Sequence, residues 1–233
     1  MKQNIKENYC PLCRGTVVNK IFQDQCRDYF LCLICHLIFV PSAQFLSAAD
    51  ERARYDLHQN SPEDQRYRKF LSRVFIPMQK RLSPGSCGLD FGSGPGPTLS
   101  VMFNEIGHSM EIYDIFYARE PSVLNRRYDF VTATEVLEHL HNPGQELDRL
   151  WTLLKPGGNL GIMTQLVKDQ ETFSLWYYKN DPTHVCFYSR TTFQWLAGRW
   201  QAEVEFADKD VILFHKKVNP VPGAYATNFA RGV

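Results

Sequence analysis

Four cysteines near the N-terminus form two C-x-x-C pairs, a spacing that can bind a metal ion. They are Cys10, Cys13, Cys32 and Cys35, with residues 14–31 between the two pairs. Each pair can present two thiolates to one tetrahedral ion, and four thiolates complete the coordination of Zn²⁺. The spacing therefore predicts a structural zinc site, with free or redox-active thiols as the alternative. Cys26 and His36 lie close enough to replace a ligand, but the paired spacing favours the four cysteines.

A glycine-rich loop follows a short apolar segment, with Gly92, Gly94 and Gly96 in the pattern G-x-G-x-G. Glycine allows sharp turns and the close approach of a ligand to the main chain. Nucleotide-like ligands bind at such loops, at the carboxyl end of the first strand of a doubly wound sheet. Pro97 breaks the dinucleotide fingerprint and no lysine follows, so neither that motif nor a P-loop is present. Asp114 ends the next predicted strand, where a carboxylate can accept both ribose hydroxyls; a plain tight turn is the alternative.

A third group of polar residues follows a later predicted strand. Glu135, Glu138 and His139 are spaced i, i+3 and i+4, so a helix would place them on one face. Two carboxylates and an imidazole on one face would form either a set of metal ligands or a charge-balanced cluster. His184 occurs later, before an aromatic residue and a predicted helix.

The elements that position these residues divide the chain into four parts. They are a zinc-binding module (1–45), a helical connector or cap (46–84), an α/β domain (85–218) and an irregular tail (219–233). Strands and helices alternate from residue 86, which predicts a mostly parallel, doubly wound sheet flanked by helices. Residues 135–154 read as one helix, residues 155–158 as a turn, and Leu160–Leu166 as the next strand. A short connection before Val211–His215 predicts an antiparallel closing strand.

Four segments resemble, in order, the motif series of class I methyltransferases that use S-adenosylmethionine. They are LDFGSGPG, IYD, YDFVTATEVLEHL and LLKPGGNLGI, and the resemblance covers residues 86–215. It implies a seven-stranded sheet whose glycine loop holds the methionine part of the cofactor and whose Asp114 holds the ribose. The implied cofactor contacts are Asp90, Gly92, Ser93, Gly94, Gly96, Asp114, Thr134 and Glu135. Residues 115–127 are few for the usual third strand, so we expect it to be truncated, and the adenine contact is unassigned.

The E-x-x-E-H segment and the later histidine resemble two O-methyltransferase groups, from ubiquinone biosynthesis and from small-RNA 2′-O-methylation. In those groups the matching residues hold a divalent ion that binds the hydroxyl oxygens of the substrate. The resemblance thus implies a second metal site formed by Glu135, Glu138, His139 and His184. The alternative is that these residues only support the cofactor loop and helix, with His184 as general base or structural partner. The candidate catalytic residues are His184 and Glu135.

The expected function is methyl transfer to a small molecule at a hydroxyl oxygen, with the zinc module shaping the substrate pocket. An RNA methyltransferase that grips RNA through the module and a non-catalytic zinc-containing binding protein are the alternatives. Lys and Arg total 26 against 25 Asp and Glu, so no global basic field favours nucleic acid. No apolar run reaches the roughly 18–20 residues of a membrane helix and no secretory signal is evident, which predicts a cytoplasmic protein. The acceptor and the oligomeric state are left open.

Overall fold

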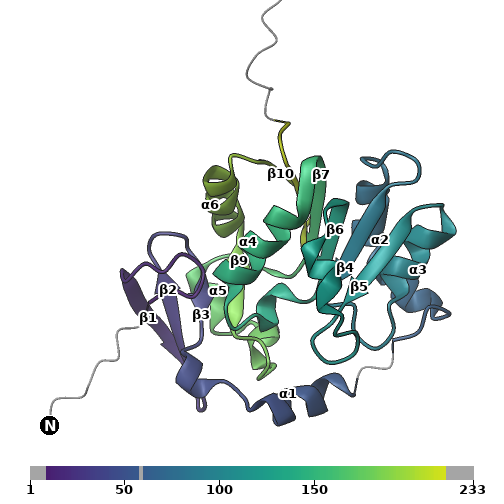
Figure 1. Ribbon diagram of the computed structural model, residues 1–233. Coiled ribbons are helices and arrows are strands. Elements are labelled where there is room, and N and C mark those ends of the chain that lie inside the picture. The colour runs from purple at the N-terminus through teal and green to yellow at the C-terminus, as the bar shows by residue number, and fades with distance from the viewer. Residues whose placement is uncertain (1–8, 58–59, 219–233) are drawn as a thin grey trace, which may run out of the picture.

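The computed structural model describes residues 9–57 and 60–218, and the predicted tail 219–233 lies outside them (Figure 1). Its strands form a six-stranded sheet in the order β10-β11-β7-β6-β4-β5 and a five-stranded sheet in the order β1-β2-β3-β9-β8. The larger sheet contains β4 (Cys87–Phe91), β5 (Ser109–Tyr113), β6 (Tyr128–Thr134), β7 (Leu154–Met163), β10 (Glu203–Asp208) and β11 (Val211–His215). The smaller contains β1 (Val18–Gln23), β2 (Asp28–Cys32), β3 (Ile38–Phe39), β8 (Leu166–Val167) and β9 (Cys186–Ser189).

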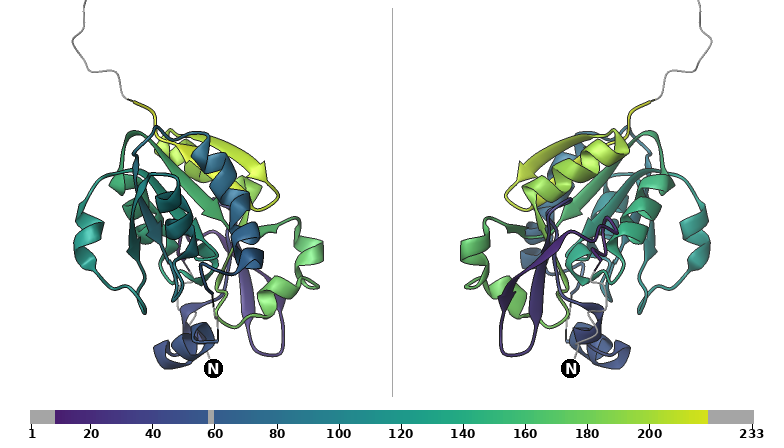
Figure 2. Two further views of the ribbon diagram at one scale, coloured as in Figure 1. Left: turned by 90° about the vertical axis from the view of Figure 1, so that its right-hand side faces the viewer. Right: turned by 90° about the vertical axis from the view of Figure 1, so that its left-hand side faces the viewer.

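Helices cover both faces of the larger sheet. The α-helices are α1 (Ala48–Tyr55), α2 (Gln65–Gln79), α3 (Thr98–Glu105), α4 (Pro143–Leu153), α5 (Gln170–Phe173) and α6 (Arg190–Trp200). Helix α2 faces the viewer in the left panel of Figure 2, and α6 does so in the right panel. Adjacent residues of β6 point to opposite faces, so Phe130 packs with α2 and α3 whereas Val131 packs with α4 and α6. No helix in the described part of the chain is long and apolar enough to cross a membrane.

The predicted α/β class is confirmed. Strands β5, β4, β6, β7 and β10 run in the same direction, while the last strand, β11, lies between β7 and β10 and is antiparallel to both, as expected for the closing strand. A truncated third strand was expected here. Described residues 115–127 instead contain a tight loop closed by an isolated bridge between Asp114 and Ala118, and a 3-10 turn, η2 (Pro121–Asn125), but no strand. A parallel crossover alone needs about a dozen residues, so this stretch is too short for a helix and another strand. The sheet therefore has six strands, with β5 at its edge.

The prediction of a single helix over residues 135–154 is wrong for residues 135–142. Glu135 has a left-handed backbone with φ of 52°, and only a 3-10 turn, η3 (Leu137–His139), follows it. Helix α4 begins at Pro143, because a proline disfavours helical geometry in the residue before it and suits the first helical position. Glu135 therefore does not share a helical face with Glu138 and His139.

The turn and strand expected after α4 are also displaced. Strand β7 begins at Leu154 and includes the Lys-Pro-Gly-Gly segment, whose Gly157 has φ of 81°. This strand ends at Met163, and Leu166 belongs instead to β8 of the smaller sheet. The positive φ at a glycine lets the strand absorb an irregularity that composition alone indicates as a turn.

The N-terminal strands do not form a sheet of their own. β3 pairs with β9, with Ile38 opposite Phe187 and Phe39 opposite Cys186. Tyr29 packs against both Phe173 and Phe187, with ring centroids 5.2 Å and 6.0 Å away. The predicted boundary at residue 45 thus separates segments that share one sheet and one hydrophobic core.

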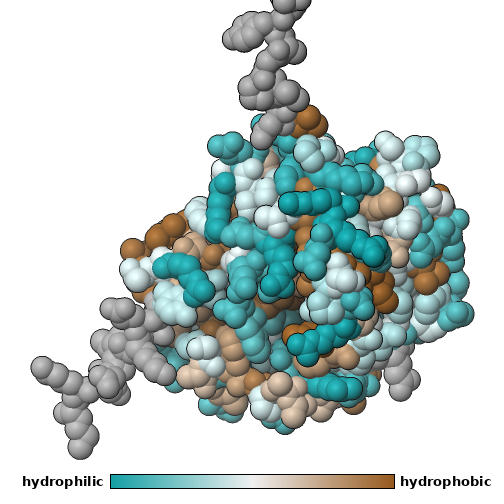
Figure 3. Space-filling model, viewed as in Figure 1, coloured by the Kyte–Doolittle hydropathy of each residue, from teal (hydrophilic) through white to brown (hydrophobic). Residues whose placement is uncertain are grey.

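The outer side of this N-terminal module is comparatively apolar. Val17, Leu33 and Ile34 are 53%, 44% and 44% exposed. In Figure 3 hydrophobic residues gather on the module at the left, whereas the face over α4 and α6 is mainly hydrophilic. The module therefore buries its inner side in the common core and presents apolar side chains to solvent on its outer side.

Candidate functional site

The four predicted cysteines come together in one cluster. Their Sγ atoms all lie within 4.8 Å of one another, with Cys10 to Cys35 and Cys13 to Cys32 each at 3.4 Å. The residue after each C-x-x-C pair has a left-handed backbone, Arg14 with φ of 63° and His36 with φ of 58°, so both pairs wrap the same kind of turn.

Backbone amides point at two of these sulfurs. Gly15 N lies 3.4 Å from Cys13 Sγ, and Ile34 N lies 3.4 Å from Cys32 Sγ. A thiol hydrogen bond from Cys35 lowers the pKa of Cys10 to about 6, while burial raises the pKa of Cys13 to about 12. Four converging sulfurs with amide donors can hold one tetrahedral zinc ion.

The glycine loop and Asp114 are joined at the carboxyl edge of the larger sheet. Gly92 and Gly94 have φ of 76° and 64°, which strongly favours glycine at both positions. A Cβ at Gly92 would lie 2.2 Å from Val136 Cγ2, so the turn after β6 packs directly on the loop. Asp114 Oδ2 accepts a hydrogen bond from Gly94 N at 3.0 Å, and Oδ1 accepts from Phe116 N at 2.8 Å. One carboxylate thus fixes the loops after β4 and β5 together.

The other predicted cofactor residues line the same edge. Asp90 is 3% exposed and accepts a hydrogen bond from Thr132 Oγ1 at 2.7 Å. Burial raises the pKa of Asp90 to about 6. Ser93 is buried within the loop, and Thr134 ends β6 next to Glu135. The predicted set is therefore contiguous in space, across the ends of β4, β5 and β6.

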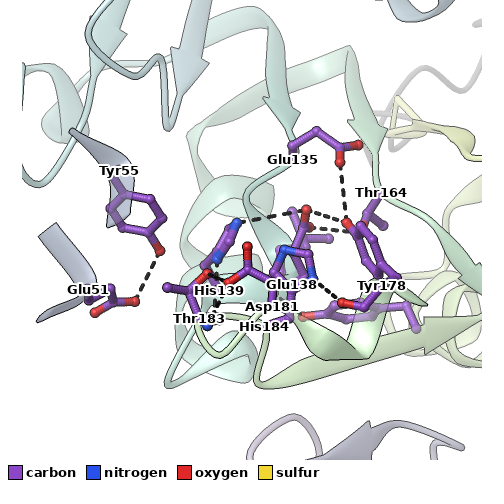
Figure 4. A network of polar contacts seen from close by, with 12 residues as sticks. Glu51, Tyr55, Glu135, Glu138, His139, Thr164, Tyr178, Asp181, Thr183 and His184 are labelled. Atoms are coloured by element: carbon purple, nitrogen blue, oxygen red, sulfur yellow. Dashed lines mark hydrogen bonds and ion pairs between the residues drawn. The ribbon is translucent and has the colours of Figure 1, made fainter. Parts of the chain in front are cut away.

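Three of the four predicted ligands of a second metal converge nearby (Figure 4). Glu138, His139 and His184 each offer a ligand atom, and these atoms lie within 4.8 Å of one another. His184 Nδ1 lies 2.7 Å from the carbonyl oxygen of Tyr178, and His139 Nδ1 lies 3.3 Å from that of Thr183. Because a carbonyl only accepts, each Nδ1 carries the proton in a neutral ring, which leaves Nε2 able to bind a metal.

Glu138 is the buried centre of this cluster. It is 0% exposed, and it accepts hydrogen bonds from Thr164 Oγ1 at 2.8 Å and from the Tyr178 hydroxyl. Burial raises the pKa of Glu138 and lowers that of His184. Both groups therefore lose hydration on folding, and a divalent cation would compensate the buried carboxylate.

Glu135 was predicted as a fourth ligand of the second metal, but it lies outside the cluster of Glu138, His139 and His184. Its carboxylate reaches toward the Tyr178 hydroxyl instead, which lies 3.4 Å from Oε2 (Figure 4). Burial and the neighbouring Glu138 charge raise the pKa of Glu135 to about 8. The Tyr178 hydroxyl thus links the two carboxylates.

Sequence reasoning missed the role of Arg27. This arginine is 7% exposed, and its guanidinium donates to the carbonyl oxygens of His184 at 2.9 Å, Pro182 at 3.3 Å and Lys179. The N-terminal module therefore holds the backbone of the segment that leads into the predicted ligand His184, and the carbonyl of His184 itself. The sequence carries no local signal for this contact, because an isolated arginine is usually a surface residue.

Helix α1 supplies two further residues that were not predicted. Glu51 is the only buried residue of this helix, accepts a hydrogen bond from the Tyr55 hydroxyl at 3.1 Å and lies 3.6 Å from His141 Nε2. The Tyr55 ring meets His139 edge-on at 5.2 Å. A polar helix that buries a glutamate gives no apolar pattern from which its docking could be predicted.

A family model described as a methyltransferase domain matches residues 58–205, more than half of the chain. The chain belongs to this methyltransferase family. It is therefore an enzyme that transfers methyl groups from S-adenosylmethionine. The match covers the glycine loop, Asp114 and the cluster around Glu138, whereas the cysteine module and α1 lie before it.

Solved structures similar to this methyltransferase include two from Burkholderia thailandensis. One is 1,6-didemethyltoxoflavin-N1-methyltransferase with 1,6-didemethyltoxoflavin and S-adenosylhomocysteine bound. It is 16% identical, covering 80% of this chain and 98% of that chain, with a TM-score of 0.48. The other is an O-methyltransferase family protein that is 15% identical, covering 72% of this chain and 62% of that chain, with a TM-score of 0.46. Comparison with curated proteins finds no match.

Proposed function

We propose that this methyltransferase methylates a hydroxyl oxygen of a small molecule with the help of a divalent ion held by Glu138, His139 and His184. The observation that carries the proposal is the convergence of these three side chains beside the glycine loop. The zinc site formed by the four cysteines is part of the same proposal, with a structural role.

The residues around the cluster fit a bound cation. One carboxylate and two imidazoles suit Mn²⁺, Fe²⁺ or Zn²⁺ better than they suit an all-oxygen Mg²⁺ site. Each ligand is oriented by a second group, the histidines by backbone carbonyls and Glu138 by Thr164 and Tyr178, as metal ligands usually are. A bound ion would lower the pKa of the acceptor hydroxyl.

Other residues would bind the cofactor and accept the proton of the acceptor hydroxyl. The glycine loop and Asp114 would hold S-adenosylmethionine, so that the protein aligns nucleophile, methyl group and sulfur. Glu135 stands between this loop and the cluster, and its pKa of about 8 suits a general base near neutral pH. His184 would act as a ligand, because its Nδ1 is already committed to the Tyr178 carbonyl.

The acceptor class can be tested with simple compounds. Phenols, catechols and sugars would be offered alongside the matching amines, and S-adenosylhomocysteine formation would be measured. We expect product with hydroxyl compounds only, and only when Mn²⁺ or another divalent ion is present. Turnover confined to amines, or turnover indifferent to added ion in protein with intact zinc, would contradict the proposal.

The cofactor site has a sharper test, because two glycines provide a matched pair. Gly94 and Gly107 both have positive φ, and an added Cβ would meet nothing within 4 Å at either position. Gly94→Val and Gly107→Val thus introduce similar backbone strain, but only the former would collide with a ligand in the loop. We expect calorimetry to show S-adenosylhomocysteine binding weakened by about a hundredfold or more in Gly94→Val alone. Equal affinities in the two variants would refute the assignment.

A further inference from the structure

Helix α1 connects two loops that flank the glycine loop. Neighbouring strands in the larger sheet follow the order β5-β4-β6, so the loop after β4 lies between the loops after β5 and β6. In Figure 1, α1 runs along the edge of the sheet where these loops emerge. A helix that contacts both outer loops must cross the glycine loop between them.

On the β5 side the contacts involve the end of α1. The Tyr117 hydroxyl donates a hydrogen bond to Asp56 Oδ1 at 2.7 Å, and the Tyr55 ring lies 5.5 Å from the Phe116 ring. On the β6 side, Tyr55 contacts His139 and Glu51 lies beside His141. The helix therefore touches the loops on both sides of the cofactor loop through polar and aromatic side chains.

The chain that follows α1 approaches the glycine loop itself. A Cβ at Gly96 would lie 1.9 Å from the carbonyl oxygen of Asn60, so the two backbones are in direct contact. Position 96 therefore has to be a glycine to leave room for Asn60, as well as for any ligand in the loop. The contact places Asn60 against the end of the predicted methionine-binding loop.

Apolar burial does not explain why α1 docks here. Its sequence is AADERARY, and Glu51 is its only buried residue. Apart from the ring contacts of Tyr55, hydrogen bonds and charges hold the helix. Breaking these interactions costs little free energy compared with exposing a packed apolar face. The helix also lies outside residues 58–205 and borders the sheet edge that lacks a third strand.

We propose that α1 is a roof over the cofactor cleft, and that Asp56 and Tyr117 form its latch on the adenosine side. The roof replaces the wall that a third strand would provide next to β5. This proposal rests on the proposed cofactor site. If it is right, the hydrogen bond between Tyr117 and Asp56 slows the release of S-adenosylhomocysteine.

The latch can be tested with S-adenosylhomocysteine as the probe. Tyr117→Phe, Asp56→Ala and the double variant would be compared with the full-length wild type by calorimetry and by stopped-flow dissociation. Arg52→Gln is the control, because it removes the exposed ion pair between Arg52 Nε and Asp56 Oδ2, 4.0 Å apart, and leaves both partners of the Tyr117–Asp56 hydrogen bond in place. Each latch variant should bind about three- to tenfold more weakly through faster dissociation, as expected for one lost hydrogen bond.

The double variant decides whether the two residues act together. It should be no weaker than either single variant, since all three lack the same hydrogen bond. Additive losses, or wild-type dissociation rates in every variant, would overturn the roof while leaving the cofactor site intact. Failure of the wild type to bind S-adenosylhomocysteine would instead overturn the proposed cofactor site, and the roof with it.

Discussion

Replacing Cys10 and Cys13 together by serine should remove about one zinc per chain and unfold far more than the N-terminal module. Structural zinc supplies about 10–16 kcal/mol of apparent binding free energy in small zinc domains, whereas a whole domain is stable by about 5–15 kcal/mol. The loss is therefore comparable with the total stability. It cannot stay local, because β3 pairs with β9 and the cysteines belong to the main hydrophobic core.

The loss of zinc should also reach the second metal site. Arg27 of the module binds the backbone at Lys179, Pro182 and His184, so a disordered module would release the loop that carries His184. Elemental analysis, thermal melting and manganese binding would measure the loss of zinc, the loss of stability and the loss of the second metal site separately.

The fifth cysteine of the module, which lies outside the cluster, provides the control for this experiment. Cys26 is exposed and lies outside the cluster, so Cys26→Ser should keep zinc, melting temperature and cofactor affinity. A zinc-free double variant that melts like the wild type would show that the four thiols need no metal.

Substituting Glu138→Gln and His184→Ala should abolish Mn²⁺ binding and reduce turnover by about a thousandfold or more. Metal assistance contributes several kcal/mol to a reaction barrier, and each 1.36 kcal/mol is a factor of ten. Glutamine keeps an acceptor for Thr164 and Tyr178, so the substitution removes charge with little change in shape. Zinc content and S-adenosylhomocysteine affinity should remain close to the wild-type values.

Manganese binding, measured by electron paramagnetic resonance on protein with intact zinc, gives a readout that does not need the acceptor. His215→Ala is a suitable control, since His215 also forms one ring-nitrogen hydrogen bond, to Asn159 Oδ1 at 3.2 Å, but lies far along the sheet. A Glu138→Gln, His184→Ala protein that misfolds or loses cofactor affinity would favour a structural role for the E-x-x-E-H segment. So would a wild type that binds no manganese.

Local patterns were sufficient to predict much of the fold. The C-x-x-C spacing predicted a cluster that the structure brings together, and β11 has the predicted bounds because an apolar run between turn residues defines a strand well. The same logic failed at Glu135. Spacing of i, i+3 and i+4 indicates a shared face only if the backbone is helical, and the left-handed φ of this residue is not encoded in the spacing.

Contacts between distant segments could not be predicted in this way. The segment Cys186–Ser189 reads as aromatic residues before a helix, and nothing in its own sequence indicates that it pairs with β3. The sequence of the roof helix α1 also does not predict where the helix docks, because it docks through Glu51 and Tyr55 rather than through an apolar stripe. In both cases the tertiary fold, and not the local sequence, determines which segment the strand or helix contacts.

The pairing of β3 with β9 has a consequence for synthesis on the ribosome. The cysteine knuckles emerge first and can capture zinc early, but their sheet stays open at β3 until the chain has been made beyond Ser189. During that interval the inner side of the module and the edge of β3 are exposed, which favours wrong pairings and aggregation. Strand β9 therefore completes a sheet that the much earlier N-terminal module begins, so truncations that remove β9 should cost solubility as well as activity.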